Sequence, residues 1–546
     1  MRASAVSGVC GGPMSGERSS TVAGMSAVTD IRPHVDPLPL ERALSGVDVL
    51  RWVDGPDGPA QGTPVAGVTV STLDLEPGWL FVAVPGLTQH GIRFAHVAAR
   101  EGAAAILTDD EGARRAEEEG LALPIAVVAD PRLVTSLVSA TVYGHPGSHL
   151  TTMAVTGTNG KTTTSYLMRA ALMVAHPDPA MCGTVETHVG GLDILSTRTT
   201  AEAPVIQRFL ALAEQSGEGA AVVETSAHAL SLHRVDGTVF DVAGFTNLQH
   251  DHLDYYHDME HYFEAKKLLF TPAHSRRGVV CVDDQWGLRL AREAEVPVVT
   301  VSALTDAAAD WTVRDTHPDR ATSRTVFTLV DPRGVGHEVE SPILGGVNVQ
   351  NTAVAIVCAV QLGLDVEAVI EAVERSSQVP GRMQKVNPDP GAQPLVVVDY
   401  AHTPEGLDWT LRSVRELTAG RVVLVFGTDG DRDASKREDL AELGAELADV
   451  LWVTDENPRT EDAQSIRDQL LAGIARIRPD LRDVTEVTTC RRDAVRRAIL
   501  ASEPGDTVIV TGKGAEWYQE IQGINHAYND VPVAREVLDQ DPRAAV

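Results

Sequence analysis

The chain has 546 residues, of which 43% are hydrophobic and 22% are charged. These proportions are typical of a soluble globular protein, and the length predicts three or four domains because one hydrophobic core does not grow to that size. The formal net charge of −30 argues against a general nucleic-acid binder, since phosphate contacts require a basic surface. A local cluster of arginine and lysine side chains remains able to bind an anionic substrate.

The cysteines and the apolar segments indicate the compartment. Five cysteines are scattered along the chain without a Cys-x-x-Cys pair, so we expect a reducing cytoplasm, with neither a zinc site nor a disulfide framework. No apolar run reaches about 18 residues, so we expect no transmembrane helix and no stable membrane insertion. No apolar segment follows Arg2, which argues against a secretory signal.

The N-terminal third of the chain changes character near residue 37. Residues 1–36 are rich in Gly, Ser, Ala and Thr and lack periodicity, which predicts a disordered tail. Residues 37–150 alternate short apolar runs with helical patterns, and proline and glycine separate them. We expect strands at 80–84, 104–107 and 125–128 and helices at 94–101 and 112–119. This alternation predicts an N-terminal α/β domain.

Residues 151–378 form the second predicted domain. The segment 150–155 has the β-branched and apolar residues of a strand, and residues 163–173 have a helical pattern. Further buried strands are expected at 220–223, 239–245, 278–282 and 298–301, whereas residues 311–340 predict β-hairpins. Strand–helix–strand units of this kind form a mainly parallel sheet.

Residues 379–546 form the third predicted domain. The segment Val379-Pro-Gly-Arg382 has the composition of a linker turn. Helical patterns then alternate with strands expected at 395–398, 422–426, 450–454 and 507–510. This alternation predicts a second doubly wound sheet.

The strongest chemical signal is the segment Gly157-Thr-Asn-Gly-Lys-Thr-Thr163, between a predicted strand and a predicted helix. Gly157 and Gly160 allow a tight turn whose N–H groups approach an anion, Lys161 supplies a positive charge, and the Thr162 hydroxyl can hold Mg²⁺. The helix N-terminus also favours negative charge. The spacing Gly-x-x-Gly-Lys-Thr is shorter than the usual loop, and a chance Gly-Lys-Thr is the alternative. The segment therefore predicts a site for ATP phosphates.

Polar groups follow the next predicted strands of this domain. Glu224 ends a strand, where a carboxylate is well placed to bind Mg²⁺; a surface or helix-capping glutamate is the alternative. The segment 245–254 places two histidines and two aspartates in one turn, although a hydrogen-bonded structural role is the alternative for each histidine. Lys266 and Lys267 follow on a predicted helix, where the alternative is a pair of solvated lysines.

Charged side chains also follow the strands of the third domain. Asp399 begins the segment Asp-Tyr-Ala-His-Thr-Pro, which predicts a nucleotide contact in a cleft or else a capped helix start. The later strands are followed by Arg432, by Arg459, and by Lys513 with Glu516. Arginines bind carboxylates in a bidentate manner, and a glutamate accepts hydrogen bonds from an ammonium group. The set predicts a site for a zwitterionic amino acid, with plain surface ion pairs as the alternative.

Together these motifs resemble those of the Mur ligase family, and within it the MurE type, which adds the third amino acid to UDP-N-acetylmuramoyl-L-alanyl-D-glutamate in peptidoglycan synthesis. The resemblance covers roughly residues 65–540. The segments that carry it occur in the family's order: Gly157-Thr-Asn-Gly-Lys-Thr-Thr163, Phe245-Thr-Asn-Leu with Asp251-His-Leu-Asp254, Asp399-Tyr-Ala-His-Thr-Pro404 and Asn457-Pro-Arg459.

The resemblance implies the fold and the reaction. The fold would be a central P-loop ATPase domain with a parallel sheet, flanked by an N-terminal UDP-binding α/β domain and a C-terminal Rossmann-like domain. The reaction would be ATP-dependent amide-bond formation through an acyl phosphate, with ATP and Mg²⁺ as cofactors and rotation of the C-terminal domain. The partners would be UDP-MurNAc-L-Ala-D-Glu and a free diamino acid, with no nucleic acid, and we expect a monomer.

The resemblance also implies the residues of the nucleotide and metal sites. The phosphate loop would consist of Gly157, Thr158, Asn159, Gly160, Lys161, Thr162 and Thr163. The metal would be held by Thr162, Glu224, His252 and Lys266, with Lys266 carbamylated by CO₂. Four side chains would be catalytic: Lys161, Glu224, His252 and carbamylated Lys266. The remaining nucleotide contacts would come from Asn348, Asn351, Arg382 and Asp399.

The same resemblance implies two groups of substrate-binding residues. The muramoyl dipeptide would be bound by Thr199, Thr200, Ser226 and Arg234, with Thr72 near the uridine. The incoming diamino acid would be bound by Arg432, Glu456, Asn457, Pro458, Arg459, Gly512 and Glu516.

The chain departs from the family pattern at several of these positions. The usual Asp-Ser-Arg near the uridine is Ser71-Thr72-Leu73, and the usual Glu-Val-Ser-Ser-His is Glu224-Thr-Ser-Ala-His228. The Asp-Asn-Pro-Arg signature for meso-diaminopimelate begins with Glu456, and Ala515 replaces the usual histidine before Glu516. Arg459 favours meso-diaminopimelate, because L-lysine has no second carboxylate. The departures at Glu456 and Ala515 keep L-lysine as the alternative.

Two further classes remain as alternatives. Another Mur enzyme or a folylpolyglutamate-type ligase would share the phosphate loop but would not need Arg432, Arg459 and Glu516 together. A non-catalytic nucleotide-binding module would bind ATP without amino-acid-dependent phosphate release.

Overall fold

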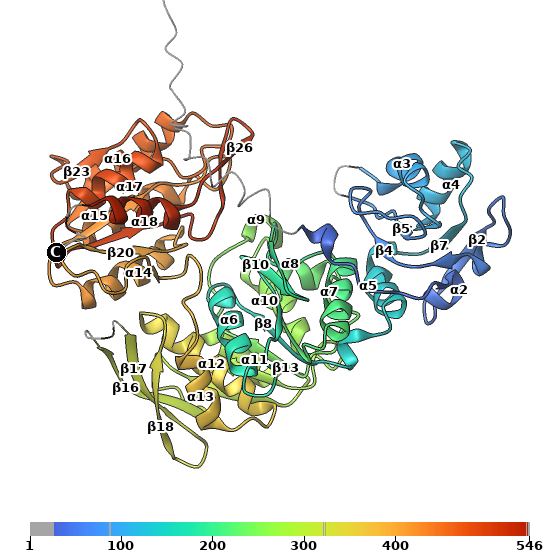
Figure 1. Ribbon diagram of the computed structural model, residues 1–546, viewed down its shortest axis with the longest axis horizontal. Coiled ribbons are helices and arrows are strands. Elements are labelled where there is room, and N and C mark those ends of the chain that lie inside the picture. The colour runs from blue at the N-terminus through green and yellow to red at the C-terminus, as the bar shows by residue number, and fades with distance from the viewer. Residues whose placement is uncertain (1–26, 87–88, 320–321, 323, 542, 544–546) are drawn as a thin grey trace, which may run out of the picture. The chain divides into compact units, whose positions relative to one another are not determined.

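The structure is a computed structural model that describes residues 27–86, 89–319, 322, 324–541 and 543 (Figure 1). The chain forms two compact units, which we name the N-terminal unit (residues 27–312 and 351–373) and the C-terminal unit (residues 313–350 and 374–541 with 543). Each unit is described by itself.

The first sheet of the N-terminal unit has the strand order β2-β7-β6-β5-β4, with β2 antiparallel to β7 and the other pairs parallel. Its strands are β2 (Val49–Val53), β4 (Val68–Thr69), β5 (Leu80–Val82), β6 (Ala105–Thr108) and β7 (Ile125–Val128). Its helices are α3 (Ala95–Arg100), α4 (Asp110–Glu118) and α5 (Pro131–Val142), and β1 (Leu38–Pro39), α2 (Leu40–Ala43) and β3 (Pro64–Val65) precede or separate the strands. The predicted strands and helices of residues 80–128 are all present, since short buried apolar runs between helices fit parallel strands.

The second sheet holds the phosphate loop. In the N-terminal unit its order is β11-β10-β9-β12-β8-β13-β14-β15-β16, parallel from β9 to β16 with β10 and β11 as an antiparallel hairpin at one edge. The strands are β8 (Thr151–Thr156), β9 (Ala180–Cys182), β10 (Glu186–Val189), β11 (Leu192–Leu195), β12 (Ala220–Glu224), β13 (Val242–Phe245), β14 (Gly278–Cys281), β15 (Val298–Ser302) and β16 (Trp311–Asp319). The short strands β9, β10 and β11 are absent from the sequence prediction.

Helices cover both faces of this sheet. They are α6 (Lys161–Leu172), α7 (Ala203–Gln215), α8 (Ala227–Ser231), α9 (Leu253–Tyr256), α10 (Met259–Lys267), α11 (Gln285–Glu293), α12 (Gly346–Gln361) and α13 (Val366–Glu374). Phe209 of α7 and Phe263 of α10 pack into one core with Val223 and Phe245 of the strands. On the other face, a Cβ on Gly244 would lie 2.9 Å from the Met168 side chain of α6, so the helix packs closely on the strand there.

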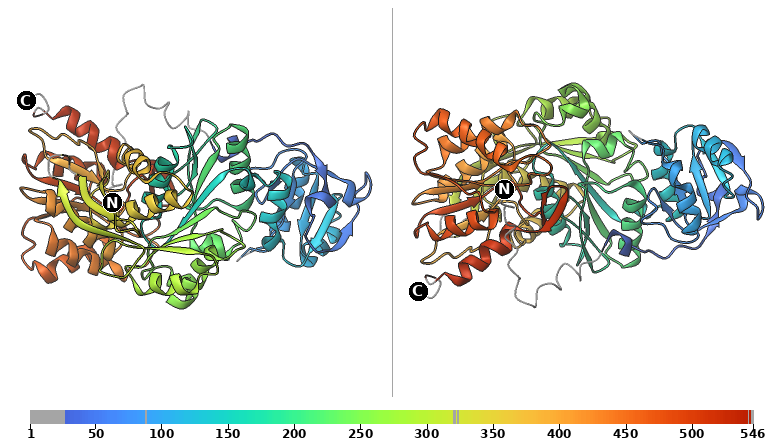
Figure 2. Two further views of the ribbon diagram at one scale, coloured as in Figure 1. Left: turned by 90° about the horizontal axis from the view of Figure 1, so that it is seen from below. Right: turned by 90° about the horizontal axis from the view of Figure 1, so that it is seen from above.

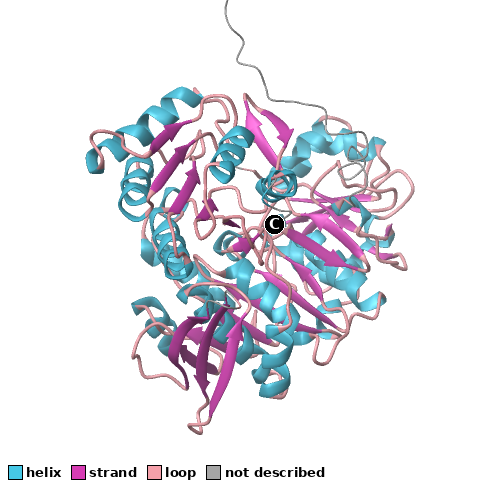
Figure 3. Cartoon of the chain, turned by 60° about the vertical axis from the view of Figure 1, so that its left-hand side comes forward, coloured by secondary structure: helices cyan, strands magenta, loops and turns pink. Residues whose placement is uncertain are grey.

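The C-terminal unit contains a six-stranded sheet of order β19-β20-β24-β21-β22-β23, in which only β19 is antiparallel to its neighbour. Its strands are β19 (Gln384–Lys385), β20 (Leu395–Val398), β21 (Val422–Phe426), β22 (Val450–Val453), β23 (Val484–Glu486) and β24 (Thr507–Val510). In Figures 2 and 3 its helices lie on the two faces of the sheet: α14 (Pro404–Leu417), α15 (Lys436–Leu447), α16 (Ala463–Ile477), α17 (Arg491–Leu500) and α18 (Asp530–Gln540). The four strands predicted for this domain are present.

The C-terminal unit also contains two antiparallel hairpins. The strands β17 (Arg324–Val330) and β18 (Gly336–Ser341) pair after β16, as the hairpin prediction for residues 311–340 expects. The strands β25 (Tyr518–Ile521) and β26 (Ile524–Ala527) form the second hairpin. Each of the three predicted domains contains one large sheet, while residues 313–350 belong to the C-terminal unit. The three-part α/β architecture predicted from the sequence is confirmed.

Residues 27–36, the first that the structure describes, differ from the prediction of a disordered tail over residues 1–36. Residues 1–26 lie outside the described residues. Ile31 is buried in the core of the second sheet, and Arg32 donates a hydrogen bond to Glu76 at 2.7 Å. The compositional pattern missed this segment because one buried apolar side chain is enough to fix a short extended stretch, and periodicity needs several.

Of the helices within the described ranges, none combines the length and the apolar character that crossing a bilayer would require. The sequence analysis expected no transmembrane helix on the same grounds, the length and the apolar character of the segments.

A buried ion pair joins α17 to α18 in the C-terminal unit. Arg491 and Asp530 have fully buried side chains, and Arg491 donates two hydrogen bonds to the Asp530 carboxylate at 2.9 and 2.8 Å. Arg491 also donates to the Thr511 carbonyl at 2.7 Å, and the Tyr528 hydroxyl donates to Asp530 at 2.8 Å. The pair therefore holds α17 and α18 together and anchors them to Thr511, the residue after β24.

We expect Asp530→Ala to lower the free energy of unfolding of the C-terminal unit by about 3–5 kcal/mol, because it leaves an uncompensated buried guanidinium. The control is Arg492→Ala, which removes the neighbouring surface pair with Glu536 and should cost no more than about 1 kcal/mol. Urea unfolding followed by circular dichroism measures both. Equal losses in the two variants would contradict the importance of the buried pair.

Candidate active site

The predicted phosphate loop joins β8 to α6. Gly157 has φ +152° and Gly160, the residue before α6, has φ +88°. A Cβ on Gly160 would lie 2.2 Å from Asn351 Oδ1, so both the backbone angle and the space require glycine. The N-terminus of α6 therefore lies at the carboxyl end of the parallel strands, where the helix dipole favours an anion.

The segment that follows β13 supports this loop. The Asn247 carbonyl accepts a hydrogen bond from the Thr158 N–H at 2.9 Å, and the Asn247 side chain accepts one from the Asn159 N–H at 3.0 Å. The Thr246 hydroxyl donates to the Asn159 carbonyl at 2.6 Å. The two motifs thus lie together, although Thr246 and Asn159 are 87 residues apart in the sequence.

Two lysines converge on one carbonyl of the loop. Lys161 Nζ donates to the carbonyls of Gly157 and Thr158 at 2.9 and 3.0 Å. Lys266 Nζ, from α10, donates to the same Gly157 carbonyl at 2.7 Å and lies 4.6 Å from the centre of the Tyr262 ring. Burial, reinforced by the positive charge of Lys161, holds the pKa of Lys266 well below its ordinary value. A neutral amine is the form that reacts with CO₂.

Glu224 lies beside the loop at the end of β12 and is fully buried. Its carboxylate accepts hydrogen bonds from the hydroxyls of Thr162 at 3.3 Å, Ser165 at 3.1 Å and Thr184 at 2.7 Å. A carboxylate and a threonine hydroxyl at the edge of a phosphate-binding loop are hard oxygen ligands suited to Mg²⁺.

His252 precedes α9, in the segment that follows β13. Its side chain is 49% exposed and its backbone has φ +55°. Its ring lies 5.0 Å from that of His228 and 6.0 Å from that of Tyr262, measured between centroids. Because Tyr262 also contacts Lys266, the structure brings His252 into the neighbourhood of the buried lysine.

The residues predicted to bind the muramoyl dipeptide form one hydrogen-bonded group. The Thr200 hydroxyl donates to the Glu224 carbonyl at 2.7 Å and accepts from the Ser226 N–H at 3.0 Å. Arg234 donates to the Thr200 carbonyl at 3.0 Å, and Thr199 accepts from Thr184 at 3.1 Å. Thr72 lies on the loop between β4 and β5.

The four other predicted nucleotide contacts divide between the two units. Asn351, on α12, lies against Gly160 in the N-terminal unit. Asn348 donates to the Leu344 carbonyl at 2.5 Å in the C-terminal unit. Arg382 stacks 4.1 Å from the centre of the Tyr400 ring, and Asp399 accepts hydrogen bonds from the Met383 N–H at 2.8 Å and other local donors.

The predicted amino-acid site of the C-terminal unit is a connected polar cluster. Asn457 is fully buried and donates to Asp429 at 2.9 Å and to Glu516 at 3.1 Å. Lys513, also fully buried, donates to Asn457 at 2.9 Å and to Glu516 at 2.7 Å. Arg459 donates to Asp429 at 3.2 Å and to Glu520 at 3.1 Å. Acidic and basic side chains thus alternate through this network of hydrogen bonds and ion pairs.

Two members of this cluster, Asp429 and Glu520, were not predicted as site residues. Asp429 stands in the segment Gly427-Thr-Asp-Gly-Asp-Arg-Asp433, which also contains the predicted Arg432, so its position after β21 was a usable signal. Glu520 comes from β25, whose backbone pairs with Arg459, and no sequence signal marked that pairing. Two further predicted site residues differ in exposure. Arg432 is exposed, whereas Pro458, which precedes Arg459 in the sequence, is buried.

Gly512 and Glu456 approach each other closely. Gly512 has φ +105°, and a Cβ there would lie 2.5 Å from Glu456 Oε2. Glu456 is 4% exposed, and its Oε2 has no hydrogen-bond partner among the described residues. Burial, with a further contribution from the negative charge of Asp429, raises the pKa of Glu456 to about 8. The residue that departs from the family signature is therefore a largely protonated carboxyl near neutral pH.

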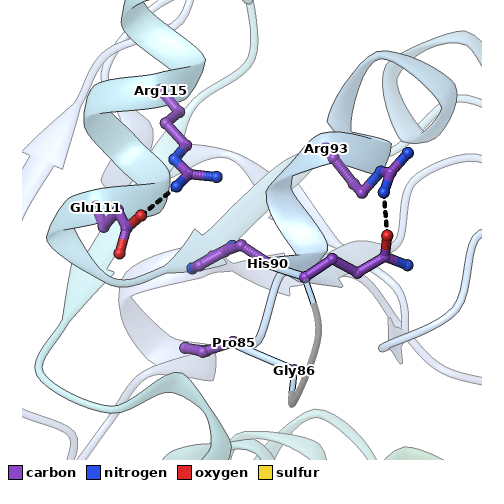
Figure 4. Close-up of a pocket in the computed structure, with 7 residues that line it drawn as sticks. Pro85, Gly86, His90, Arg93, Glu111 and Arg115 are labelled. Atoms are coloured by element: carbon purple, nitrogen blue, oxygen red, sulfur yellow. Dashed lines mark hydrogen bonds and ion pairs between the residues drawn. The ribbon is translucent and has the colours of Figure 1, made fainter.

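Sequence reasoning also missed a pocket in the N-terminal domain (Figure 4). Its volume is about 540 Å³, and it is lined by Pro85, Gly86, Gln89, His90, Arg93, Glu111 and Arg115. Arg93 pairs with Gln89 and Arg115 pairs with Glu111. Two guanidinium groups at one pocket favour an anionic ligand.

Two family models match the chain. The Mur ligase middle domain matches residues 155–359, and the Mur ligase glutamate ligase domain matches residues 381–514. The chain belongs to the Mur ligase family. The resemblance drawn from the phosphate loop and the Asn-Pro-Arg motif is confirmed.

Curated relatives agree with the family. The chain is 43% identical to the UDP-N-acetylmuramoyl-L-alanyl-D-glutamate–2,6-diaminopimelate ligase of Streptomyces coelicolor over 486 residues, which are 89% of this chain and 94% of that one. It is 42% identical to the UDP-N-acetylmuramyl-tripeptide synthetase of Leifsonia xyli over 517 residues, which are 94% of this chain and 98% of that one.

Solved structures show the same architecture. A UDP-N-acetylmuramoyl-L-alanyl-D-glutamate–2,6-diaminopimelate ligase matches with a TM-score of 0.64 and 30% identity, covering 92% of this chain and 99% of that one. The MurF ligase of Thermotoga maritima in complex with ADP matches with a TM-score of 0.59 and 17% identity, covering 87% of this chain and 98% of that one. The second likeness concerns the fold alone.

We expect the raised pKa of Glu456 to make stability depend on pH. The folded state holds the proton up to about pH 8, while the unfolded chain releases it near pH 4.5, so the stabilisation is complete below about pH 4.5 and is lost as the pH rises through about 8. The melting temperature of wild type, measured relative to that of Glu456→Gln, should therefore fall between about pH 4.5 and about pH 8. A constant difference in melting temperature between the two proteins from about pH 4.5 to about 8.5 would contradict the shift.

Proposed function

We propose that this protein is an ATP-dependent ligase that joins meso-diaminopimelate to UDP-N-acetylmuramoyl-L-alanyl-D-glutamate, forming ADP and phosphate, in peptidoglycan synthesis. The observation that carries the choice of amino acid is Arg459, a half-buried guanidinium oriented by Asp429 and Glu520 within the polar cluster of the C-terminal unit. Diaminopimelate has a second carboxylate for such a group, and L-lysine does not. The names of the relatives point to the same substrate.

The phosphate loop supports ATP as the cofactor. Gly157 and Gly160 allow the tight turn of the loop, and Lys161, the first residue of α6, places a cation beside it. We assign Asn351, which packs against Gly160, to the nucleotide site as well. The contacts proposed for Asn348, Arg382 and Asp399 rest on the family resemblance.

The oxygen-rich surroundings of Glu224 fit a Mg²⁺ ion, with Thr162, Glu224, His252 and carbamylated Lys266 as the proposed ligands. Bound Mg²⁺ would neutralise negative charge where the substrate carboxylate approaches the triphosphate. Lys266 is buried at the loop, and burial holds the pKa of its amine well below the ordinary value. Its conversion to a carbamate would replace a poor cation with an anionic oxygen donor.

The reaction follows from these assignments in two steps. The γ-carboxylate of the D-glutamyl residue attacks the γ-phosphorus of ATP, so that a carboxyl-oxygen–phosphorus bond forms and ADP leaves. The amine of the diamino acid then attacks the acyl carbon, loses a proton, and displaces phosphate. Lys161 stabilises charge on the transferred phosphoryl group, and Thr199, Thr200, Ser226 and Arg234 are proposed to position the dipeptide.

The diamino acid is proposed to bind at the cluster of the C-terminal unit. The carboxylates Asp429 and Glu516 provide acceptors for an ammonium group, and Arg459 provides donors for the distal carboxylate. Arg432, Glu456, Pro458 and Gly512 complete the proposed set. Asn457 and Lys513 hold Glu516 in place through buried hydrogen bonds.

We propose the pocket around His90, Arg93 and Arg115 for the uridine diphosphate part of the substrate, because two arginines there match two phosphates. Thr72 remains a proposed contact on the same domain. A cytoplasmic location is proposed because the scattered cysteines of the sequence form no Cys-x-x-Cys pair, as is usual in a reducing compartment. The monomeric state stays a prediction.

We expect wild-type enzyme supplied with ATP, UDP-muramoyl dipeptide, and equal amounts of meso-diaminopimelate and L-lysine to give mainly the diaminopimelate tripeptide, as weighed by mass spectrometry. Arg459→Ala should lower kcat/KM for diaminopimelate by about 100-fold, the loss expected for a charge-assisted pair, and should affect L-lysine much less. Arg482→Ala, at an exposed position of the same unit, is the control. A mainly lysine product would overturn the substrate, and no ADP with any amino acid would overturn the ligase.

We expect Lys266→Ala to lower turnover by about 100-fold or more, since a charged group at the reacting centre is lost, and added bicarbonate should not restore it. The matched control is Lys267→Ala on the same helix, where the lysine pairs with Glu264 and Glu293 at the surface and should matter little. Phosphate release measures both. Normal turnover of Lys266→Ala would refute the carbamate.

A further inference from the structure

A second cluster of ligand-type side chains lies at the edge of the central sheet opposite the phosphate loop. Asp178 precedes β9, Glu218 precedes β12, and His188 lies near the end of β10, which runs antiparallel to β9. The phosphate loop and Glu224 stand at the other ends of β8 and β12. One ligand atom of each of Asp178, His188 and Glu218 lies within 4.8 Å of the other two.

Glu218 is the feature that points to a cation. Its side chain is buried, with 7% of the residue exposed. Oε1 accepts a hydrogen bond from the Gly190 N–H at 2.6 Å, but the buried Oε2 receives none from any residue in the described part of the chain. A buried carboxylate oxygen without a partner is costly, and a metal ion among these three residues would satisfy it.

His188 has the surroundings of a metal-ligating histidine. Its side chain is 15% exposed, and Nδ1 lies 2.6 Å from Asp193 Oδ1 on the adjoining strand β11. Nε2 faces the two Asp178 oxygens at 3.0 and 3.1 Å. One nitrogen is thus oriented by an outer carboxylate while the other faces the proposed ligand set, which is the arrangement that fixes ligating imidazoles in metal sites.

The charged side chains of this group have a net negative charge, which favours a divalent cation. Three carboxylates, those of Asp178, Asp193 and Glu218, stand against one guanidinium, that of Arg169, which donates to Asp178 at 2.5 Å and to the Pro179 carbonyl at 2.7 Å. With a neutral imidazole the group carries two negative charges. Arg169 donates to Asp178 Oδ1 and anchors the segment to α6, while Asp178 Oδ2 lies 3.1 Å from His188 Nε2. A bound ion would therefore take the place of the hydrogen bond between His188 and Asp178.

We propose that Asp178, His188 and Glu218 bind one Zn²⁺ ion, with Asp193 positioning His188. One imidazole and two carboxylates suit Zn²⁺ better than Mg²⁺ or Ca²⁺, which prefer oxygen ligands alone. Metal–ligand distances of about 2.0–2.2 Å require the three atoms to move closer by side-chain rotation. His176 lies near: its Nδ1 would be 2.6 Å from a Cβ on Gly219, next to Glu218, and it or water supplies the fourth ligand.

The site would be structural. It would join the β10–β11 hairpin to the segments that follow α6 and α7, far along the sheet from the phosphate loop. The expectation of no zinc site in this chain depended on the absence of paired cysteines, and a site of histidine and carboxylates gives no such signature.

The test uses the full-length protein, freed of metal by a chelator and then held in excess Mg²⁺ so that the phosphate-loop region is occupied. Zn²⁺ alone is titrated by calorimetry, and Co²⁺ absorption reports the coordination. We expect one Zn²⁺ per chain, with affinity reduced at least about tenfold in Glu218→Gln and His188→Asn and by about tenfold in Asp193→Asn. His149→Asn, which removes a surface histidine paired with Glu214, should bind as wild type.

Glu218→Gln keeps the shape of the side chain, so it decides the matter if His188→Asn fails to fold, as judged by circular dichroism of the metal-free proteins. Zn²⁺ should also raise the melting temperature of wild type and not that of Glu218→Gln. The proposal is overturned if wild type binds no Zn²⁺ in the presence of Mg²⁺, or if Glu218→Gln binds it as wild type does. Neither outcome bears on the ligase reaction.

Discussion

The Gly157 carbonyl accepts hydrogen bonds from two lysines of distant segments, Lys161 at 2.9 Å and Lys266 at 2.7 Å, and the active-site chemistry depends on this convergence. Two amines at one carbonyl, in a buried place, cannot both carry a full charge at low cost. Lys161 lies at the loop and retains access to an anion, while the buried Lys266 is the one whose pKa falls. This difference in burial and pKa is what supports the two separate roles proposed for the lysines.

The conformation of the phosphate loop also determines which side chains lie next to it. Because Gly157 and Gly160 have positive φ angles, the chain turns sharply enough to bring α6 over the sheet, and Thr162 then meets Glu224 from the neighbouring strand. The segment after β13 holds the loop from the other side through Thr246 and Asn247. Glu224 ends a strand, whereas Thr162 and His252 lie in the segments that follow the strands β8 and β13, and Lys266 comes from the helix α10. The first three ligands therefore follow adjacent parallel strands, as expected for a doubly wound sheet.

In the C-terminal unit the polar cluster has a different physical basis. Asn457 and Lys513 are fully buried, so their hydrogen bonds must be satisfied internally, and Glu516 and Asp429 satisfy them. The cost of leaving any one of these groups unpaired holds the others in fixed positions. A rigid set of acceptors with Arg459 at its border is suited to select an amino acid with charge at both ends. Glu456 adds a carboxyl that is protonated near neutral pH, a property its identity alone does not reveal.

The sequence by itself determined the alternation of strands and helices in the three α/β domains, the phosphate loop, and the polar residues at strand ends, because short apolar runs and glycine spacing are local signals. The sequence analysis missed the short strands β9, β10 and β11 and the buried Ile31, because segments this short show no hydrophobic periodicity. Only the tertiary structure decided that Lys266 lies on Gly157, that Glu520 borders Arg459, and that Glu218 and His188 meet at the far edge of the sheet. These neighbours are separated by many residues, and contacts of that kind depend on the path of the whole chain and on burial, which no local pattern records.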